Sequence, residues 1–144
     1  MAKLSNQSVI YDFETLSQDP VKGIVVNFAA LVFDETRFKT NPYTFKELVE
    51  SAELIKFDTK EQVEVYGRRP DKGTLDWWSK QNPEARSMLN PSSEDVSISE
   101  LYDFCKGIAQ KPKRVYTRGN SFDPVFLSQI MLQLGQKEPW DWWN

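Results

Sequence analysis

The apolar residues in the first part of the chain follow patterns that are typical of β-strands. Residues 9–14 alternate, so Tyr11 and Phe13 fall on one face of a predicted strand, and Asp12 and Glu14 fall on the other. Residues 24–33 form a nearly continuous apolar run rich in β-branched and aromatic residues. Such a run predicts a central strand that is covered on both faces.

A third, shorter strand is predicted for residues 52–58, after a polar connection at residues 34–42. Beyond residue 70 the pattern becomes helical. Thr74 predicts the N-cap of a helix that runs to residue 79. Asn82 followed by proline predicts the start of a second helical piece, which ends before Asn90.

The last third of the chain is predicted to contain a helix, a short strand and another helix. Ser97 and Glu100 match a capping box, and an apolar stripe at helical spacing follows over residues 98–108. Residues 114–117 predict the strand, and residues 123–135 predict the final helix, closed by a glycine. Because strands come first and helices later, the order predicts an α/β or α+β domain, and of these we expect an α/β fold with a mixed central sheet flanked by helices.

Composition and charge fit a soluble globular domain and limit how it can bind its partners. The 144 residues are 40% hydrophobic and 27% charged, with a formal net charge of −3, so there is no basic field over the whole molecule. Any contact with phosphate would have to come from local groups of basic residues, although solvated loop ends are the favoured interpretation of both groups: Arg68, Arg69 and Lys72; and Lys111, Lys113, Arg114 and Arg118.

The residues that are rare or missing exclude several kinds of chemistry. Cys105 is the single cysteine, which excludes a disulfide within the chain, and its place in an apolar stripe predicts a core position. The chain has no histidine, which excludes catalytic triads and histidine-zinc sites in these residues. No signal peptide or run of ~20 apolar residues is visible, so we expect a cytoplasmic protein with no membrane partner.

Carboxylates are therefore the candidates for chemistry. Asp12 and Glu14 leave the same face of one strand, where two negative charges repel each other unless a cation or a proton intervenes. Mg²⁺ or Mn²⁺ is the natural cation for such a pair, although the solvent side of an amphipathic strand would show the same pattern. Asp123 has two open interpretations, a helix N-cap or a carboxylate delivered to the edge of the sheet beside Asp12 and Glu14.

Two parts of the chain resemble the first two exonuclease motifs of the DnaQ-like (DEDD) superfamily: Asp12-Phe13-Glu14-Thr15 and Asn120-Ser121-Phe122-Asp123. Within that superfamily, residues 75–86 (LDWWSKQNPEAR) and 118–123 (RGNSFD) are similar to segments of the branch formed by phage exonuclease A and the RNase T-like enzymes. The resemblance covers nearly the whole chain. It implies an RNase H-like fold and a 3′-5′ exonuclease activity.

The resemblance also implies roles for individual residues. Asp12, Glu14 and Asp123 would coordinate two divalent ions, Mg²⁺ or Mn²⁺, that bind the scissile phosphate. Thr15 and Leu16 would contact the terminal nucleotide at the 3′ end of single-stranded DNA or RNA. Asn120 and Phe122 are further candidate substrate-binding residues, and Phe122 could pack below the terminal nucleotide.

Trp77 and Trp78 are also candidate substrate-binding residues. Adjacent positions on a helix lie roughly 100° apart, so the two rings cannot both face the core squarely. One of them could offer a stacking surface to a base, although core packing of both is the favoured interpretation.

The chain departs from the family at its end. The third exonuclease motif, with a fourth carboxylate and a histidine or tyrosine base, is absent, and the acids after Asp123 are Glu138 and Asp141, neither with a suitable partner. Residues 1–144 are therefore expected to be the N-terminal two-thirds of an exonuclease domain that is missing its C-terminal elements, and to be weakly active or inactive without the fourth carboxylate and the base. A catalytically inactive pseudo-nuclease that binds nucleic acid or protein is the alternative, and a structural domain with acidic surface residues is a third.

The last five residues include three tryptophans, Trp140, Trp142 and Trp143. Apolar surface of this kind is usually covered, so the sequence predicts a homodimer or a protein partner at this end.

Overall fold

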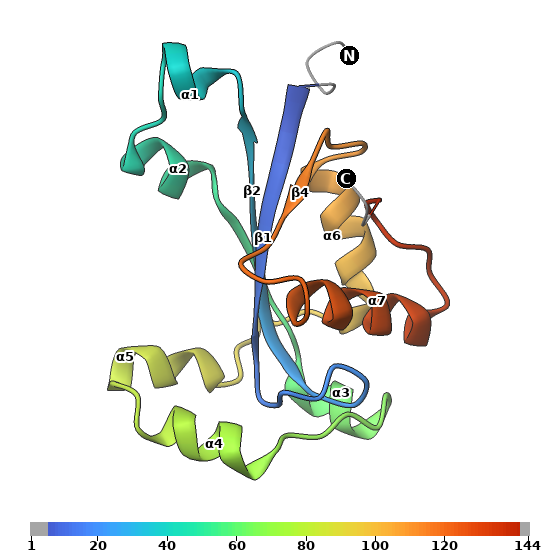
Figure 1. Cartoon of the computed structure of the whole chain (residues 1–144). Coiled ribbons are helices and arrows are strands. Elements are labelled where there is room, and N and C mark those ends of the chain that lie inside the picture. The colour runs from blue at the N-terminus through green and yellow to red at the C-terminus, as the bar shows by residue number, and fades with distance from the viewer. Residues whose placement is uncertain (1–5, 142–144) are drawn as a thin grey trace.

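The computed structural model describes residues 6–141, which form a four-stranded mixed sheet with the strand order β3-β2-β1-β4 (Figure 1). β1 (Gln7–Thr15) pairs antiparallel with β2 (Val25–Asp34) and parallel with β4 (Val115–Tyr116). β3 (Glu53–Lys56) pairs antiparallel with β2. The predicted strands are confirmed, and β1 is central, as its apolar neighbour indicated.

The two faces of the sheet are covered to different extents. Val9, Tyr11, Phe13 and Phe28 lie on one face and are buried. In Figure 1, α6 (Leu101–Ile108) and α7 (Asp123–Leu134) lie on one side of the sheet, and their apolar residues join the same core cluster. The predicted covering of β2 on both faces holds for its buried start, Val25–Phe28, whereas its residues from Leu31 onward are only half-buried.

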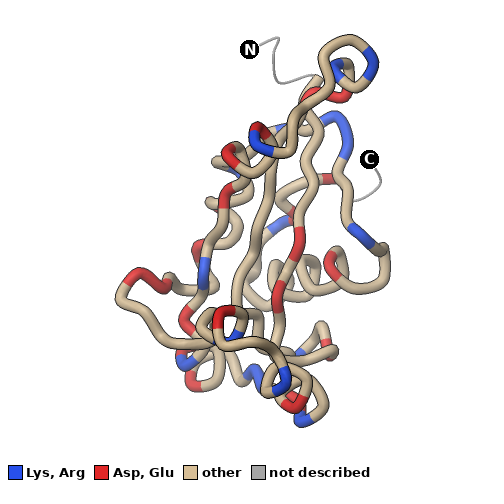
Figure 2. The backbone as a smooth tube through the Cα atoms, turned by 90° about the vertical axis from the view of Figure 1, so that its left-hand side faces the viewer, with Lys and Arg blue, Asp and Glu red and all other residues tan. Residues whose placement is uncertain are grey.

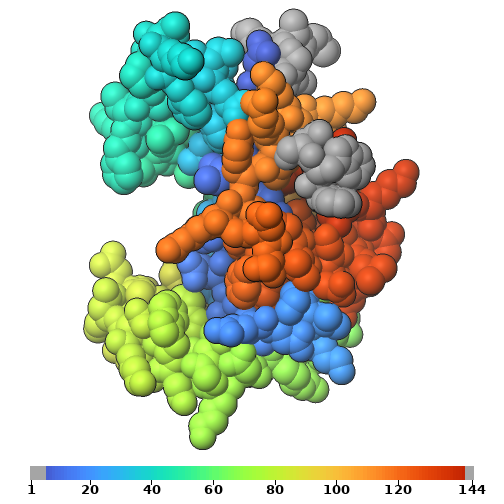
Figure 3. Space-filling view, viewed as in Figure 1, coloured from blue at the N-terminus to red at the C-terminus, as the bar shows by residue number. Residues whose placement is uncertain are grey.

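The opposite face of the sheet carries the acids and is bordered at its two ends by short helices. α1 (Arg37–Thr40) and α2 (Phe45–Ser51) lie at one end, and α4 (Lys72–Ser79) and α5 (Pro83–Arg86) lie at the other (Figure 1). The space-filling view shows a hollow between these two groups (Figure 3). α3 (Thr59–Glu64) lies near the α4 end.

The helix predictions are confirmed in position, but two starts differ. α4 is capped by Asp71, whose carboxylate accepts a hydrogen bond from the Thr74 amide, so Thr74 was the wrong N-cap. Ser97 precedes a 3-10 turn, η3 (Ile98–Glu100), which leads into α6. Its hydroxyl accepts from the Ser99 amide and not from that of Glu100, so the predicted capping box does not form.

α1, α2 and α3 were not predicted. α1 buries no residue and has no side-chain cap, so its sequence lacks the apolar stripe that identifies a helix. α2 does begin with a capping box, in which Thr44 and Glu47 satisfy each other's backbone amides.

The second helical piece agrees with its prediction: α5 is capped by Asn82 and followed by the 3-10 turn η2 (Ser87–Leu89). The core position of Cys105 is confirmed, since the side chain is fully buried. α7 ends at Gly135 in the left-handed conformation, with φ of 68°, as the glycine predicted.

The described part of the C-terminal end packs onto its own domain. Trp140 is 4% exposed, and its indole N–H donates to the carbonyl of Ala109 at 2.8 Å. Its ring centroid lies 5.7 Å from that of Tyr11. The core of the chain itself therefore covers this tryptophan, whereas Trp142 and Trp143 lie outside the described residues. The homodimer or protein partner expected at this end stays a prediction. No helix within residues 6–141 is long and apolar enough to cross a lipid bilayer.

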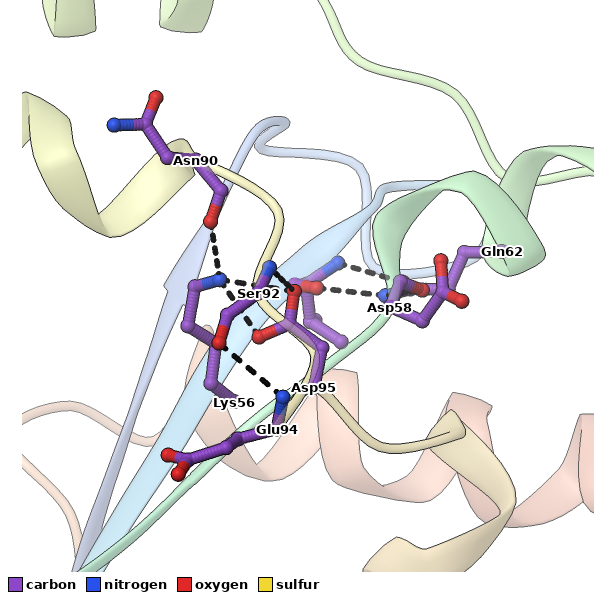
Figure 4. A network of polar contacts seen from close by, with 8 residues as sticks. Lys56, Asp58, Gln62, Asn90, Ser92, Glu94 and Asp95 are labelled. Carbon is purple, nitrogen blue, oxygen red and sulfur yellow. Dashed lines mark hydrogen bonds and ion pairs between the residues drawn. The ribbon is translucent and has the colours of Figure 1, made fainter.

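A polar network anchors the segment after η2 to the edge of the sheet (Figure 4). The Lys56 ammonium group in β3 donates to the carbonyl of Asn90 at 2.6 Å and to the Asp95 carboxylate at 2.8 Å. The same carboxylate accepts from the Ser92 amide at 2.9 Å. The two charged side chains are 19% and 10% exposed, so the pair is shielded from most of the solvent.

Lys56→Met is expected to destabilise the protein by about 1–2 kcal/mol, because it leaves a shielded carboxylate without its cation. Urea unfolding followed by tryptophan fluorescence would measure this change. The exposed pair of Lys60 and Glu64 offers a control, since Lys60→Met should change stability by less than about 0.5 kcal/mol. Equal losses in both variants would contradict the role given to the network.

Candidate active site

Asp12 and Glu14 lie in β1, on the face of the sheet that α6 and α7 leave uncovered. Their positions in the sheet are opposite Ala29 and Asn27 of β2. Asp12 is exposed and Glu14 is half-buried, whereas Phe13 between them points to the core and is 4% exposed. The alternation predicted from the sequence is confirmed. Figure 2 looks onto the molecule from this side.

Asp123 joins these two acids from the start of α7. Its side chain is buried, and its Oδ1 atom accepts a hydrogen bond of 2.9 Å from the Phe13 amide. Since Phe13 stands between Asp12 and Glu14, this bond holds the third carboxylate beside the acidic pair. The N-cap position of α7 belongs to Phe122. Of the two open interpretations of Asp123, the structure therefore supports delivery to the sheet.

The pKa shifts of the three acids agree with this convergence. Asp12 keeps part of its surface in solvent, but the protein around it desolvates the carboxylate in part and so raises its pKa. The Asp123 carboxylate raises this pKa further, and the Arg118 guanidinium lowers it. Burial also raises the pKa of Glu14, followed by the charges of Asp12 and Asp123. Burial raises the pKa of Asp123 too, against the lowering effect of the Phe13 amide. The group thus carries negative charge that a cation would stabilise.

The donor set of this acid group, Asp12, Glu14 and Asp123, fits a hard divalent cation. All three side chains offer carboxylate oxygens, which Mg²⁺ and Mn²⁺ prefer. Within residues 6–141, however, no three acidic, histidine or cysteine side chains are arranged so that they could hold one ion together. The acids suit ions that take one or two protein ligands each and complete their coordination with water and phosphate, which is the usual manner of Mg²⁺.

Arg118 borders the acid group and was not among the site residues predicted from the sequence. It lines a cavity of about 200 Å³ together with Asp12 and with apolar residues of β1, β2 and the end of α2: Ile10, Ala29, Leu31 and Ala52. Arg118 is exposed, as a solvated loop end would be, and its place beside Asp12 is also compatible with the phosphate contact that the basic groups left open. Its place directly after β4, in the motif that leads to Asp123, was the available signal.

The other candidate residues are distributed around the acid group. Thr15 is buried, and its hydroxyl donates to the carbonyl of Ser17 at 2.6 Å. Leu16 is half-buried, and Phe122 packs on Phe126 with ring centroids 4.9 Å apart. Asn120 is not brought to the cavity beside Asp12.

Asn120 lines a separate cavity of about 480 Å³. Tyr11 and Trp140 line the same cavity, and Tyr11 belongs to the face of β1 that the helices cover. Tyr11 also lines the cavity beside Asp12, whereas Asn120 does not, so the role of Asn120 in substrate binding stays a prediction.

The two adjacent tryptophans differ in environment. Trp78 is 6% exposed, and its indole N–H donates to the carbonyl of Thr15 at 2.9 Å. Trp77 is 54% exposed, and its ring stands edge-on to that of Trp78 with centroids 5.2 Å apart. The favoured interpretation, in which both tryptophans pack in the core, is wrong for Trp77. Only one side of α4 faces the core, and Trp77 lies on the solvent side. The stacking role is wrong for Trp78, whose ring faces are covered.

The basic group at residues 68–72 also differs from its prediction. Arg68 is 1% exposed, and its guanidinium donates to the carbonyl of Gly23 at 2.6 Å and to the side chain of Gln133 at 2.9 Å. It is a buried structural residue and not a solvated loop end. The local sequence carries no sign of this, because the partners are 45 and 65 positions away.

Asp71 joins α4 to the chain that follows β1. Its carboxylate accepts from the Thr74 amide at 2.6 Å and from the Gln18 amide at 2.8 Å. These two hydrogen bonds lower the pKa of Asp71 from 3.8 to about 2.

A folded-state pKa below the unfolded value means that the ionised Asp71 stabilises the protein above about pH 4 and that this contribution is lost as pH falls through about 2. The Tm of the wild type should exceed that of Asp71→Asn by ~2–4 °C at neutral pH. The difference should vanish near pH 2. Calorimetry of both proteins from pH 7 to pH 2 measures it, and a difference that is constant with pH would contradict the assignment.

The mixed sheet, the covering helices and the acids of β1 and α7 define the class of protein, an RNase H-like domain of the DnaQ-like 3′-5′ exonuclease type. A family model described as the 3′-5′ exoribonuclease Rv2179c-like domain matches residues 7–144, and the chain belongs to this family. The resemblance seen in the sequence is thereby confirmed.

A phage relative agrees with this assignment. The exodeoxyribonuclease of Enterobacteria phage T4 is 38% identical over 132 residues, which cover 84% of this chain and 54% of the phage protein. The chain thus spans about half the length of that relative.

Solved structures of E. coli exonuclease I support the fold. The zinc-bound form of its complex with single-stranded DNA matches with a TM-score of 0.61 and 16% identity, over 94% of this chain and 25% of that one. Its complex with a dT13 oligonucleotide matches with the same TM-score, identity and coverage. At this level of identity the match supports the RNase H-like fold alone.

Proposed function

We propose that this domain removes nucleotides from the 3′ end of single-stranded nucleic acid by metal-dependent hydrolysis of the phosphodiester bond. One observation carries the proposal: the hydrogen bond from the Phe13 amide holds the buried Asp123 carboxylate beside Asp12 and Glu14. An acid group of this kind, on the uncovered face of a sheet, is suited to bring divalent cations to a phosphate.

Asp12, Glu14 and Asp123 would hold Mg²⁺ or Mn²⁺. When bound, such ions neutralise charge on a phosphate and lower the pKa of a water molecule. The protein's own contribution is to fix the carboxylates: β1 presents two of them, and the Phe13 amide orients the third. Arg118 lies next to Asp12 and would donate to a phosphate oxygen.

The terminal nucleotide would lie against the residues that continue β1. Thr15 and Leu16 follow Glu14 directly, and Leu16 has exposed side-chain surface. Phe122 precedes Asp123 and could pack below the nucleotide. Trp77 is an exposed aromatic residue whose ring packs edge-on against Trp78, and the Trp78 indole N–H donates to the Thr15 carbonyl. The Trp77 ring would offer a stacking surface to a base.

Single-stranded DNA is the first substrate to test. The phage relative is named an exodeoxyribonuclease, and the matching structures of exonuclease I include complexes with single-stranded DNA. The family description names an exoribonuclease, so RNA of the same sequence belongs in every assay.

Binding without cleavage is a second candidate function. It is favoured by the lack, within residues 6–141, of three side chains arranged to hold one metal ion, and by the absence of histidine from the chain. A positioned base contributes typically 10²–10⁴-fold to such a reaction, so a domain that works without one would cleave very slowly.

The test uses single-stranded DNA and RNA oligonucleotides labelled at either end, incubated with the protein and Mg²⁺ or Mn²⁺. A 5′-labelled strand that shortens to a ladder, together with early release of the 3′ label, would support the exonuclease. A reaction that persists in EDTA would point to another nuclease in the preparation. Retarded mobility of strands that keep their full length would support the binding function.

A further inference from the structure

The chain that follows the acids of β1 is held by a distant part of the sequence. We call residues 15–24 the post-β1 loop and residues 68–78 the brace. The loop begins at Thr15 and closes on itself through a 2.9 Å hydrogen bond from the Leu16 amide to the carbonyl of Ile24. A Cβ atom on Gly23 would come within 2.4 Å of the Asp19 carbonyl oxygen, so the loop is folded too tightly for another residue there.

Six hydrogen bonds join the brace to this loop, over most of its length. Three are between backbone groups: Asp71 to Leu16 at 2.9 Å, Arg69 to Lys22 at 2.7 Å, and Ile24 to Arg69 at 3.2 Å. Three involve side chains of the brace, from Trp78 to the Thr15 carbonyl, from Arg68 to the Gly23 carbonyl, and from the Gln18 amide to Asp71.

Two of these side chains bury polar groups, and burying a polar group costs free energy that an apolar side chain in the same place would not. Trp78 buries its indole N–H and directs it to Thr15, the residue after Glu14. Arg68 buries a guanidinium with no carboxylate bound to it and with its Nη2 atom lacking a partner. Burying a cation in this way is unfavourable unless other interactions compensate, and here its hydrogen bonds go to the loop and to α7.

Arg68 therefore connects the two segments that carry the acid group, β1 with its following loop and α7. Through Gly23 it holds the loop that continues from Asp12 and Glu14, and through Gln133 it holds the helix that begins with Asp123. Gln133 in turn donates to the carbonyl of Tyr66, just before the brace.

We infer that the brace positions the residues that receive the 3′-terminal nucleotide. Trp78 and Asp71 hold the post-β1 loop in the place where it would contact the terminal sugar. The inference rests on the proposed function, because it takes Thr15 and Leu16 as the residues that receive the 3′ end. Trp78 and Asp71 act through the loop and do not touch the substrate themselves. The loop then requires little reordering when the nucleotide binds.

Two variants separate this role from general stability. Trp78→Phe keeps an aromatic ring but removes the N–H that binds Thr15. Asp71→Asn keeps one oxygen for the Thr74 amide at the start of α4, but it places an amide group where the second oxygen accepts from Gln18. Asn82→Ala is the matched control, since Asn82 caps α5 in the same way and makes no hydrogen bond to the loop.

The measurement is the affinity of each protein for a 5′-fluorescent single-stranded oligonucleotide that ends in a 3′-hydroxyl or in a 3′-phosphate, with Ca²⁺ in place of Mg²⁺. The wild type should prefer the free 3′-hydroxyl end. Trp78→Phe and Asp71→Asn should each lose about 3- to 10-fold of affinity for that end, the value of one hydrogen bond, and little for the blocked end. Asn82→Ala should bind both as the wild type does.

Amide exchange gives a second readout that does not depend on substrate. The Gln18 amide should exchange faster in Asp71→Asn and should be unchanged in Asn82→Ala. If the wild type prefers the free end and both variants keep that preference, the inference is overturned and the proposed function stands. If the wild type does not distinguish the two ends, the proposed function fails and the inference fails with it. Unchanged Gln18 exchange in Asp71→Asn would also overturn the inference.

Discussion

Asp12→Asn is expected to lower kcat/KM for removal of the 3′ nucleotide by at least about 10²-fold, the usual effect of losing one charged group that acts on the transition state. Asparagine has nearly the same shape, and Asp12 is exposed, so the fold should be retained. The lost negative charge is the one that lies beside both Asp123 and Arg118. Release of a 3′-terminal label under single-turnover conditions measures the change.

The same variant should bind divalent cations more weakly. A ligand that binds only the native state raises the Tm, so Mn²⁺ should raise the Tm of the wild type more than that of Asp12→Asn. Glu53→Gln is a matched control, because Glu53 is an exposed acid on a strand of the same sheet. A cleavage rate or an Mn²⁺ response in Asp12→Asn equal to that of the wild type would remove this carboxylate from the proposed site.

The local part of the acid group could be predicted from the sequence because strand geometry is simple. Side chains two positions apart leave the same face, so Asp12 and Glu14 needed only the identification of β1 as a strand. The long apolar run of β2 indicated that β1 was central, and the sheet order confirms it. Tertiary structure was not needed for this step.

The role of Asp123 could not be predicted from local sequence patterns. Its position before proline at a helix start fitted an N-cap equally well, and nothing nearby in the sequence decides between a cap and a sheet-directed carboxylate. The decision depends on its bond to the Phe13 amide, 110 positions away, and on the parallel pairing of β4 with β1. The family resemblance, and not the spacing, indicated the outcome.

The brace could not be predicted for the same reason. Trp77 and Trp78 look equivalent in the sequence, yet one is 54% exposed and the other 6%. The two residues differ in burial because Trp78 faces the Thr15 carbonyl, which accepts a hydrogen bond from its buried indole N–H. Arg68 looked like part of a basic surface because its partners, Gly23 and Gln133, lie in other elements.

The electrostatics of the site imply an order of events. The site combines three carboxylates, Asp12, Glu14 and Asp123, with the positive charge of Arg118 next to Asp12. A phosphate that approaches without divalent ions would therefore meet net negative charge. Repulsion at close range is strong where solvent is partly excluded. Divalent cations are therefore expected to be needed for binding of the 3′ end and not only for its cleavage.

Trp77→Ala is expected to weaken binding of single-stranded DNA by about 1–3 kcal/mol, or roughly 5- to 150-fold in Kd, the range for losing one base-stacking aromatic ring. Trp77 as a whole is 54% exposed, and its neighbour Trp78 donates a hydrogen bond to Thr15 at the start of the post-β1 loop. The exposed ring is thus within reach of a nucleotide held by that loop. Fluorescence anisotropy of a labelled oligonucleotide, with Ca²⁺ to prevent cleavage, measures the change.

Leu75→Ala is the control for Trp77→Ala, because Leu75 lies on the same helix, is 41% exposed and carries no aromatic ring. It should leave the affinity within about twofold of the wild type, whereas Trp77→Phe should recover part of the loss, since a smaller ring still stacks. The loss should also be similar for different base sequences, because every base has a face that can stack. If Trp77→Ala binds as tightly as Leu75→Ala, the exposed ring has no part in holding the strand, and its exposure has some other cause.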